Sequence, residues 1–232
     1  QQVEMLWDSI FRNFPIGSIV LSAKIGEQST KSSAIESHSQ EVSHHILDGQ
    51  QRTNAIAWGF NKNKLQKISE KVVQCLWLDL NPKRLSSKKD NSRHYFFRVT
   101  TKAHPWGFKA DALSSPIGIN KRIKFIEDDG YKDSFGHFPM EAGFPIPLAS
   151  LWPCFVDGKL DIKKLRNDVF YKKVLETLDE TKHPDDKCFE ELEIGLKNAV
   201  NCCLIGLIIP EELSKIEDIE QIFLRLNRQG TP

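Results

Sequence analysis

The sequence predicts an α+β fold, with strands and helices mixed along the chain and no internal repeat. Apolar residues recur at three- and four-residue spacing in several segments, which predicts amphipathic helices. Between them lie short runs of β-branched and aromatic residues, which predict strands. With 232 residues, of which 40% are hydrophobic and 27% charged, the chain can form a hydrophobic core.

The chain begins with a helix and a strand. Pro15 ends the helical pattern, and residues 16–21 then read as a buried strand. Residues 22–44 are polar and predict a loop or a partly disordered segment. The apolar positions that define the helix are Val3, Leu6, Trp7, Ile10, Phe11 and Phe14.

A short strand then runs into Asp48-Gly49, and a second helical pattern starts at once. We expect Asp48 to cap this helix, and Gly49 to allow a sharp turn close to a ligand. Gln50, Gln51 and Arg52 fall on the first helical turn, where free backbone N–H groups and a guanidinium attract anions. This pattern predicts a phosphate site. In the alternative reading, Asp48 and Arg52 form an exposed ion pair on a capped helix.

Residues 72–80 and 95–101 predict a pair of strands, and residues 103–153 read as irregular. Basic residues gather in the loop between the two strands and again near residue 122. Each group is either a solvated loop or a contact to a phosphate backbone. The residues concerned are Lys83, Arg84, Lys88, Lys89 and Arg93, then Lys121, Arg122 and Lys124.

The last third predicts a helix over residues 161–180, a second from residue 186, a buried strand over 204–209 closed by Pro210, and a final helix to Asn227. Asn227 and Gly230 suit the C-terminal cap of that final helix.

Composition limits the classes of function. A net charge of +1 predicts no strong electrostatic field, so any nucleic-acid contact must come from local patches. Five cysteines without a CxxC pair argue against a disulfide framework and a thiolate zinc site, and indicate a reducing, cytoplasmic compartment. The longest apolar run, 202–209, is too short to cross a bilayer, so we expect no membrane contact. The chain starts inside a helix and stops at a turn, so we expect a fragment of a longer protein.

Three stretches together resemble one family. They are Leu6-Trp7-Asp8-Ser9-Ile10 with Phe14-Pro15-Ile16-Gly17-Ser18, then Ile46-Leu47-Asp48-Gly49-Gln50-Gln51-Arg52, and finally Phe223-Leu224-Arg225-Leu226-Asn227-Arg228-Gln229-Gly230-Thr231-Pro232. Their order resembles the DGQQR-motif domains of the GmrSD type, which are similar to the ParB/sulfiredoxin-like superfamily. The resemblance implies one domain over residues 1–232, with a small mixed sheet, packed helices and a family-variable insertion at 103–185.

In restriction proteins of the GmrSD and SspE type, the DGQQR motif is tied to hydrolysis of nucleoside triphosphates (NTPs) that controls a nuclease. The resemblance implies that Asp48, Gln50, Gln51 and Arg52 are catalytic, with Gly49 and Arg52 against the nucleotide. Arg225, Asn227, Gly230 and Thr231 would form a second wall. Asp48 would hold Mg²⁺, cap the helix or orient a neighbour. The resemblance implies a nuclease domain after Pro232, and the histidines of this sequence form no arrangement of the His-Asn-His nuclease type. No Walker-type loop is present in the sequence.

The function expected from this resemblance is an NTP-binding and NTP-hydrolysing regulatory domain of a bacterial DNA-restriction, phage-defence protein. Two alternatives remain. One is a DNA-binding or modification-sensing module without NTP turnover, in which Arg52 meets a DNA phosphate. The other is a catalytically silent ParB-like scaffold.

Overall fold

The computed structural model describes residues 2–23, 44–60, 75–82, 93–100, 142–177, 183–213 and 215–228. The chain divides into two compact units. The first unit consists of residues 1–14 and 58–202, and the second unit of residues 15–57 and 203–232. Both contain helices and strands, so the predicted α+β class is confirmed, whereas the ParB-like topology stays a prediction.

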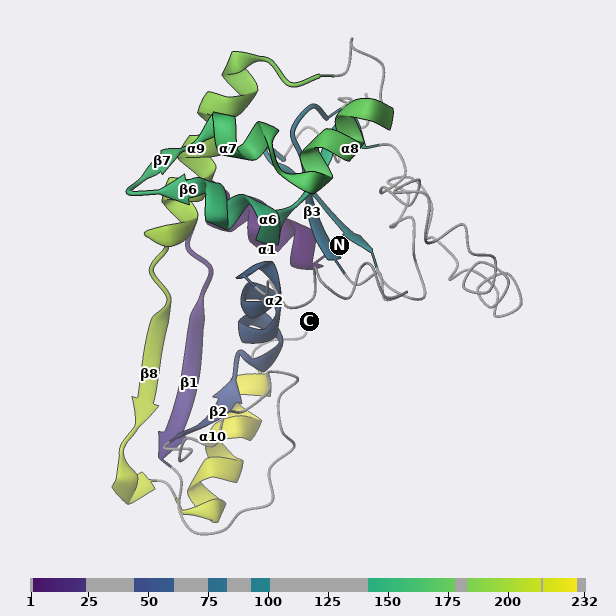
Figure 1. The fold of residues 1–232 in the computed structure, drawn as a ribbon. Helices are drawn as coiled ribbons and strands as arrows, with labels where there is room; N and C mark the ends of the chain where they lie inside the picture. The colour runs from purple at the N-terminus through teal and green to yellow at the C-terminus, as the bar shows by residue number, and fades with distance from the viewer. Residues whose placement is uncertain are drawn as a thin grey trace, which may run out of the picture. The chain divides into compact units, whose positions relative to one another are not determined.

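The second unit holds a three-stranded sheet in the order β2-β1-β8 (Figure 1). Strand β1 (Ser18–Ala23) is antiparallel to β2 (His44–Asp48) and parallel to β8 (Ile205–Ile209). Helix α2 (Gln50–Phe60) follows β2, and the division between the units falls inside this helix. After β8 come the short 3₁₀ helix η4 (Glu211–Leu213) and helix α10 (Ile216–Arg228).

Strand β8 forms where the sequence predicts it, but the prediction that it is buried was wrong. Ile205, Leu207 and Ile208 are 61%, 52% and 63% exposed, and Ile209 alone in the strand is buried. The reason lies in the strand order, because β8 is an outer strand with β1 as its one neighbour in the described sheet. A run of apolar residues therefore predicts that a strand forms more dependably than it predicts that the strand is buried.

The first unit holds an antiparallel sheet in the order β4-β3-β5. The central strand β3 (Cys75–Asp79) pairs with β4 (Phe96–Thr100), as the sequence predicts, and with β5 (Pro145–Pro147). Strand β5, helix α6 (Leu148–Leu151) and the 3₁₀ helix η2 (Trp152–Cys154) fall in the stretch predicted to be irregular, so that prediction was wrong for these residues. Proline at both ends of β5 is compatible with a strand because β5 lies at the edge of its sheet.

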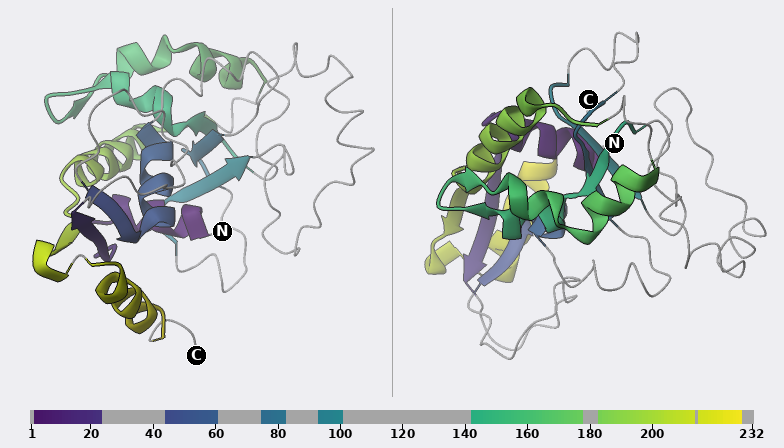
Figure 2. Two further views of the ribbon diagram at one scale, coloured as in Figure 1. Left: turned by 90° about the horizontal axis from the view of Figure 1, so that it is seen from below. Right: turned by 45° about the horizontal axis from the view of Figure 1, so that its top comes forward.

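Helices surround this sheet. Helix α1 (Gln2–Phe11) packs against β4 and against α9 (Asp186–Val200) (Figure 2). A small hairpin of β6 (Phe155–Val156) and β7 (Lys159–Leu160) precedes α7 (Ile162–Arg166) and α8 (Val169–Thr177).

One helix was predicted over residues 161–180, but the structure has two, α7 and α8. The Asp168 carboxylate accepts hydrogen bonds from the backbone N–H groups of Phe170, at 2.8 Å, and Tyr171, at 3.2 Å. It thereby caps the start of α8 and separates it from α7.

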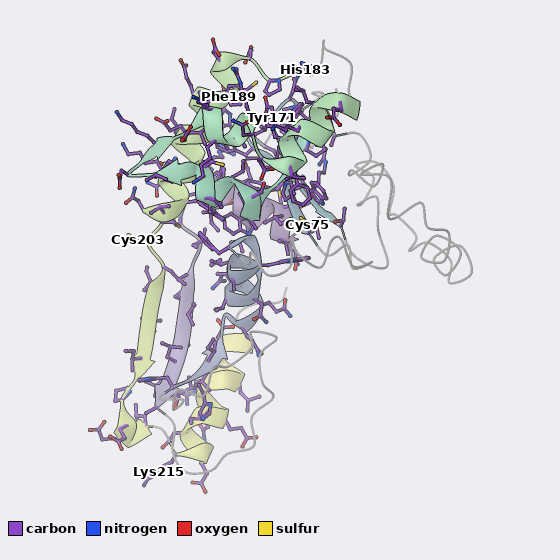
Figure 3. The ribbon with its side chains drawn as sticks, viewed as in Figure 1. Cys75, Tyr171, His183, Phe189, Cys203 and Lys215 are labelled. Carbon is purple, nitrogen blue, oxygen red and sulfur yellow. The ribbon has the colours of Figure 1, made fainter. Side chains whose placement is uncertain are left out.

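The core of the first unit is rich in aromatic side chains. Trp7 and Phe11 of α1 are fully buried, and the Phe11 ring meets the Phe97 ring edge-on, with centroids 4.9 Å apart. Tyr171 contacts Phe144 at 5.0 Å and Phe189 at 6.5 Å between ring centroids. Figure 3 labels Tyr171 and Phe189 close to one another. These contacts join α1, α8, α9 and the sheet into one core.

Candidate functional site

The predicted phosphate turn lies in the second unit, where β2 ends and α2 begins. Val20 of β1 pairs with Asp48 and Leu21 with Ile46, so Leu47 is the extra residue of a β-bulge. Gly49 follows with a positive φ of +88°. A β-carbon on Gly49 would lie 3.2 Å from the carbonyl oxygen of Ser18, so the turn also approaches β1 too closely for most side chains.

Gly49, and not Asp48, occupies the N-cap position of α2. Its carbonyl oxygen accepts the backbone N–H of Thr53 at 2.9 Å and the Thr53 hydroxyl at 3.1 Å. Asp48 is the last residue of β2 and is exposed. The expectation that Asp48 caps the helix was therefore wrong, because the bulged strand extends through this residue and the helix starts after the glycine.

The Asp48 side chain has no hydrogen-bond or ion-pair partner among the residues that the structure describes. It is thus separate from Arg52, and the alternative of an Asp48–Arg52 ion pair was also wrong. An exposed carboxylate beside a helix N-terminus can bind a hydrated cation.

Arg52 turns back from α2 toward the start of β1. Its Nη1 donates a hydrogen bond to the Ser18 carbonyl oxygen, and its side chain is half-buried. Gly17, at φ +87°, lies directly against the guanidinium, since a β-carbon there would be 3.2 Å from Cζ. The sequence placed Arg52 on the turn but gave no sign that Gly17 and Ser18 would contact it.

Gln50 and Gln51 are exposed on the first turn of α2. The backbone N–H groups of Gln50, Gln51 and Arg52 have no carbonyl partner inside the helix because of their position in its first turn. The turn therefore combines free N–H donors, a fixed guanidinium, two amide side chains and an exposed carboxylate. This set can bind an oxyanion and a cation beside it.

The predicted second wall is described in part. Arg225 is exposed on α10, and Asn227 lies near the end of that helix. Gly230 and Thr231 lie outside the described residues, as do the basic side chains predicted for DNA contact, Lys83, Arg84, Lys88, Lys89, Lys121, Arg122 and Lys124. The roles of these residues stay predictions.

The first unit contains buried carboxylates that the sequence reading missed. Glu4 and Asp8 of α1 are 5% and 2% exposed. Glu4 Oε1 accepts the N–H of Val99 at 3.1 Å, and Asp8 Oδ1 accepts those of Tyr95 at 2.8 Å and His94 at 3.1 Å. These two side chains satisfy N–H groups along the edge strand β4 and just before it, so their role is structural. Their four-residue spacing on the same helix face as Trp7 could have indicated burial.

Asp79 is a third buried carboxylate, 4% exposed at the end of β3. It accepts backbone N–H groups of Gly143 at 2.8 Å, Phe144 at 2.7 Å and Asn81 at 3.2 Å. Loss of hydration on burial raises the pKa of Asp79, and the three hydrogen bonds act in the opposite direction. The carboxylate thus anchors the segment that leads into β5.

A cleft of about 190 Å³ lies beside Asp79, between the ends of β3 and β4 and the start of α9. Several of its polar groups have partners within the protein. The Tyr95 hydroxyl donates to the Glu191 carbonyl oxygen at 2.9 Å, and Asp185 accepts the N–H of Cys188 at 2.9 Å as the cap of α9. We therefore assign this cleft no ligand.

No three His, Cys, Asp or Glu side chains are placed to hold a metal ion in the part of the chain that the structure describes. Within the same residues, no helix has the length and apolar character needed to traverse a bilayer.

The structure is an α+β domain in which a strand, a glycine with positive φ and a helix together form the turn that carries Asp48 to Arg52. The family described as the GmrSD restriction endonuclease, N-terminal domain, matches residues 1–232. The chain belongs to this family, as its three motifs predict. No curated protein and no solved structure matches the chain.

Proposed function

We propose that the second unit binds a nucleoside triphosphate at the turn formed by Asp48 to Arg52 and hydrolyses it to control a nuclease domain. The observation that carries the proposal is the position of Arg52. Its guanidinium is held against Gly17 and Ser18, within the same short segment as the free N–H groups that begin α2. Both groups attract phosphate oxygens, and their combined positive charge favours a polyphosphate over a neutral ligand.

Mg²⁺ belongs to the same proposal. Proteins bind Mg²⁺ through one or two carboxylates together with substrate phosphates and water, so a single protein ligand is sufficient. Asp48 fits this role because it is exposed and has no partner within the described residues. The ion would offset the repulsion between this carboxylate and the phosphates.

In the proposed reaction, water attacks the γ-phosphorus, the bond from that phosphorus to the bridging oxygen breaks, and inorganic phosphate and nucleoside diphosphate leave. Arg52 and the N–H groups of α2 stabilise the charge on the phosphate oxygens. The amide of Gln50 or Gln51, both exposed on the first helical turn, orients the attacking water. Arg225, Asn227, Gly230 and Thr231 are proposed to contact the nucleotide from the C-terminal segment.

Membership of the GmrSD family supports the biological part of the proposal. The domain acts in bacterial defence against phage or modified DNA, and nucleotide turnover controls a nuclease domain of the same longer chain. Contact with DNA is proposed for the basic residues 83–89 and 121–124.

The test is a thermal melt of the protein with ATP, GTP, CTP or UTP and Mg²⁺, followed by measurement of phosphate release. A nucleotide at one hundred times its dissociation constant stabilises the fold by about 2.7 kcal/mol. For a chain of this size that is a rise of roughly 5–10 °C in melting temperature. Arg52→Ala is expected to remove most of the rise while weak binding remains measurable, and Asp48→Ala to remove the part that depends on Mg²⁺.

Lys163→Ala is the matched control because it removes an exposed cation from α7, in the other unit. If no nucleotide raises the melting temperature of the wild type and no phosphate is released, the proposal is refuted. A DNA affinity that falls by about one log unit per phosphate contact for each tenfold rise in salt would then favour the DNA-binding alternative.

A further inference from the structure

We infer that Gly17 is a positioning residue for Arg52: its missing side chain leaves room for the guanidinium to stack flat on the backbone and present one edge to phosphate. This inference rests on the proposed function and assigns the geometry with which the same site binds its anion. It concerns residues 17, 18 and 52, all in the second unit.

The Arg52 guanidinium faces Gly17 with its flat side. A β-carbon on Gly17 would lie 3.2 Å from Cζ of Arg52, 3.2 Å from Nη2 and 3.3 Å from Nη1. If it approached the rim of the planar group, Cζ would be clearly farther away than the nitrogens. The near-equal distances therefore place Gly17 over the flat face of the guanidinium.

The hydrogen bond to Ser18 sets the orientation of the guanidinium within its plane. Nη1 donates to the Ser18 carbonyl oxygen, which fixes the rotation of the group. Nη1 lies on the same side as Cδ, whereas Nε–H and Nη2–H point together in another direction. Among the described residues, Ser18 alone accepts a hydrogen bond from Arg52, so the Nε–Nη2 edge remains unused. This edge is the one that binds two oxygens of a phosphate side by side.

Both the backbone conformation and the contact with Arg52 favour glycine at position 17. Gly17 has φ +87°, a conformation that other residues adopt at a cost. Alanine at this position would add a β-carbon 3.2 Å from the guanidinium, so the guanidinium would have to shift by a few tenths of an ångström from its place beside Ser18. The same glycine therefore serves the backbone turn before β1 and the placement of Arg52 on α2.

The experiment combines nuclear magnetic resonance of ¹⁵N-arginine-labelled protein with nucleotide binding by calorimetry, using ATP and GTP with Mg²⁺. In the wild type, the Arg52 guanidinium is expected to give separate Nη signals, because its rotation is slowed by stacking and by the Ser18 bond. Arg52→Lys identifies these signals by removing them. Gly17→Ala is expected to merge them and to weaken nucleotide binding roughly tenfold, the effect of losing one well-aligned bond to a charged group.

A double-mutant cycle separates positioning from general damage. In an Arg52→Ala background, Gly17→Ala is expected to have no further effect on the dissociation constant, since the residue through which it acts is absent. Gly158→Ala is the control for backbone strain: Gly158 has φ +77°, but a β-carbon there would meet no atom within 4 Å. It should leave both the Arg52 signals and binding unchanged.

The outcomes distinguish this inference from the proposed function. If the wild type binds no nucleotide, the proposed function fails, while the Arg52 signals still report on positioning. Merged Arg52 signals in the wild type, or unchanged signals in Gly17→Ala, would overturn the inference. So would an equal loss of binding from Gly17→Ala with and without Arg52. If Gly17→Ala does not fold, Gly17→Asn replaces it, because asparagine tolerates positive φ and adds the same β-carbon.

Discussion

Asp79 and Asp8 are both buried carboxylates, yet we expect the same substitution, Asp to Asn, to affect them very differently. Asp8 accepts both of its backbone N–H groups, from His94 and Tyr95, at the single oxygen Oδ1. Asp8→Asn keeps an amide oxygen in that place and loses the 3.4 Å contact from the partly exposed Arg12 to Oδ2. Its expected effect on the free energy of unfolding is below about 1 kcal/mol.

Asp79 distributes its bonds over both oxygens. Oδ1 accepts Asn81 and Phe144, and Oδ2 accepts Gly143. An asparagine has one acceptor oxygen, so its NH₂ group must face a buried backbone donor in either orientation. One buried N–H group is then left without an acceptor, at a cost of about 1–3 kcal/mol. We therefore expect Asp79→Asn to lower the free energy of unfolding by roughly this amount.

The assay is urea denaturation followed by circular dichroism, with wild type, Asp8→Asn and Asp79→Asn compared at pH 7. Burial raises the pKa of Asp79 above that of the unfolded chain, so the folded form binds its proton more tightly. The stability due to Asp79 is then fully present below the pKa that this group has in the unfolded chain, and it is lost as pH rises through the pKa that the group has in the folded protein. The free energy of unfolding of the wild type should therefore rise relative to that of Asp79→Asn as pH falls. An Asp79→Asn variant no less stable than Asp8→Asn would refute the reasoning.

Three further outcomes follow from single contacts. Gly59→Ala should destabilise the first unit by about 1–3 kcal/mol by overpacking, because a β-carbon there would lie 2.0 Å from Cζ2 of Trp7. Gly206→Ala, with open space around the new β-carbon, is the near-neutral control in the same urea assay. Asp185→Ala should cost about 1 kcal/mol by removing the cap of α9, and Asp186→Ala, one residue into the helix, should cost less if capping is the cause. Burial raises the pKa of Cys188 to about 11, so its alkylation by iodoacetamide, followed by mass spectrometry, should increase with pH up to that region; a plateau near pH 9 would contradict the buried environment.

The sequence was sufficient for features that local pattern decides. The antiparallel partners β3 and β4, the strand β1 and the helix after Gly49 all follow from runs of apolar residues and from turn glycines. The family was recognisable because its motifs are contiguous stretches of chain.

Features that depend on distant neighbours were not predictable in this way. The spacing of Glu4 and Asp8 could have indicated their burial, but not their partners, because the N–H groups that they accept lie about 90 residues further along the chain. The exposure of β8 depends on strand order, and the position of the Arg52 guanidinium depends on a hydrogen bond to Ser18 across 34 residues. The α7–α8 break is different, since Asp168 before Val169 and Phe170 was a readable cap that a long apolar pattern obscured.

The parallel pairing of β1 with β8 has a consequence for how the protein folds. Ser18 is paired with Ile205, so β1 gains this second neighbour only after the ribosome has made the chain as far as residue 205. The first unit, most of which lies between these strands in sequence, can complete its own core earlier. Pairings of such long sequence separation form slowly. The turn that carries Asp48 and Arg52 should therefore reach its folded conformation after the aromatic core of the first unit.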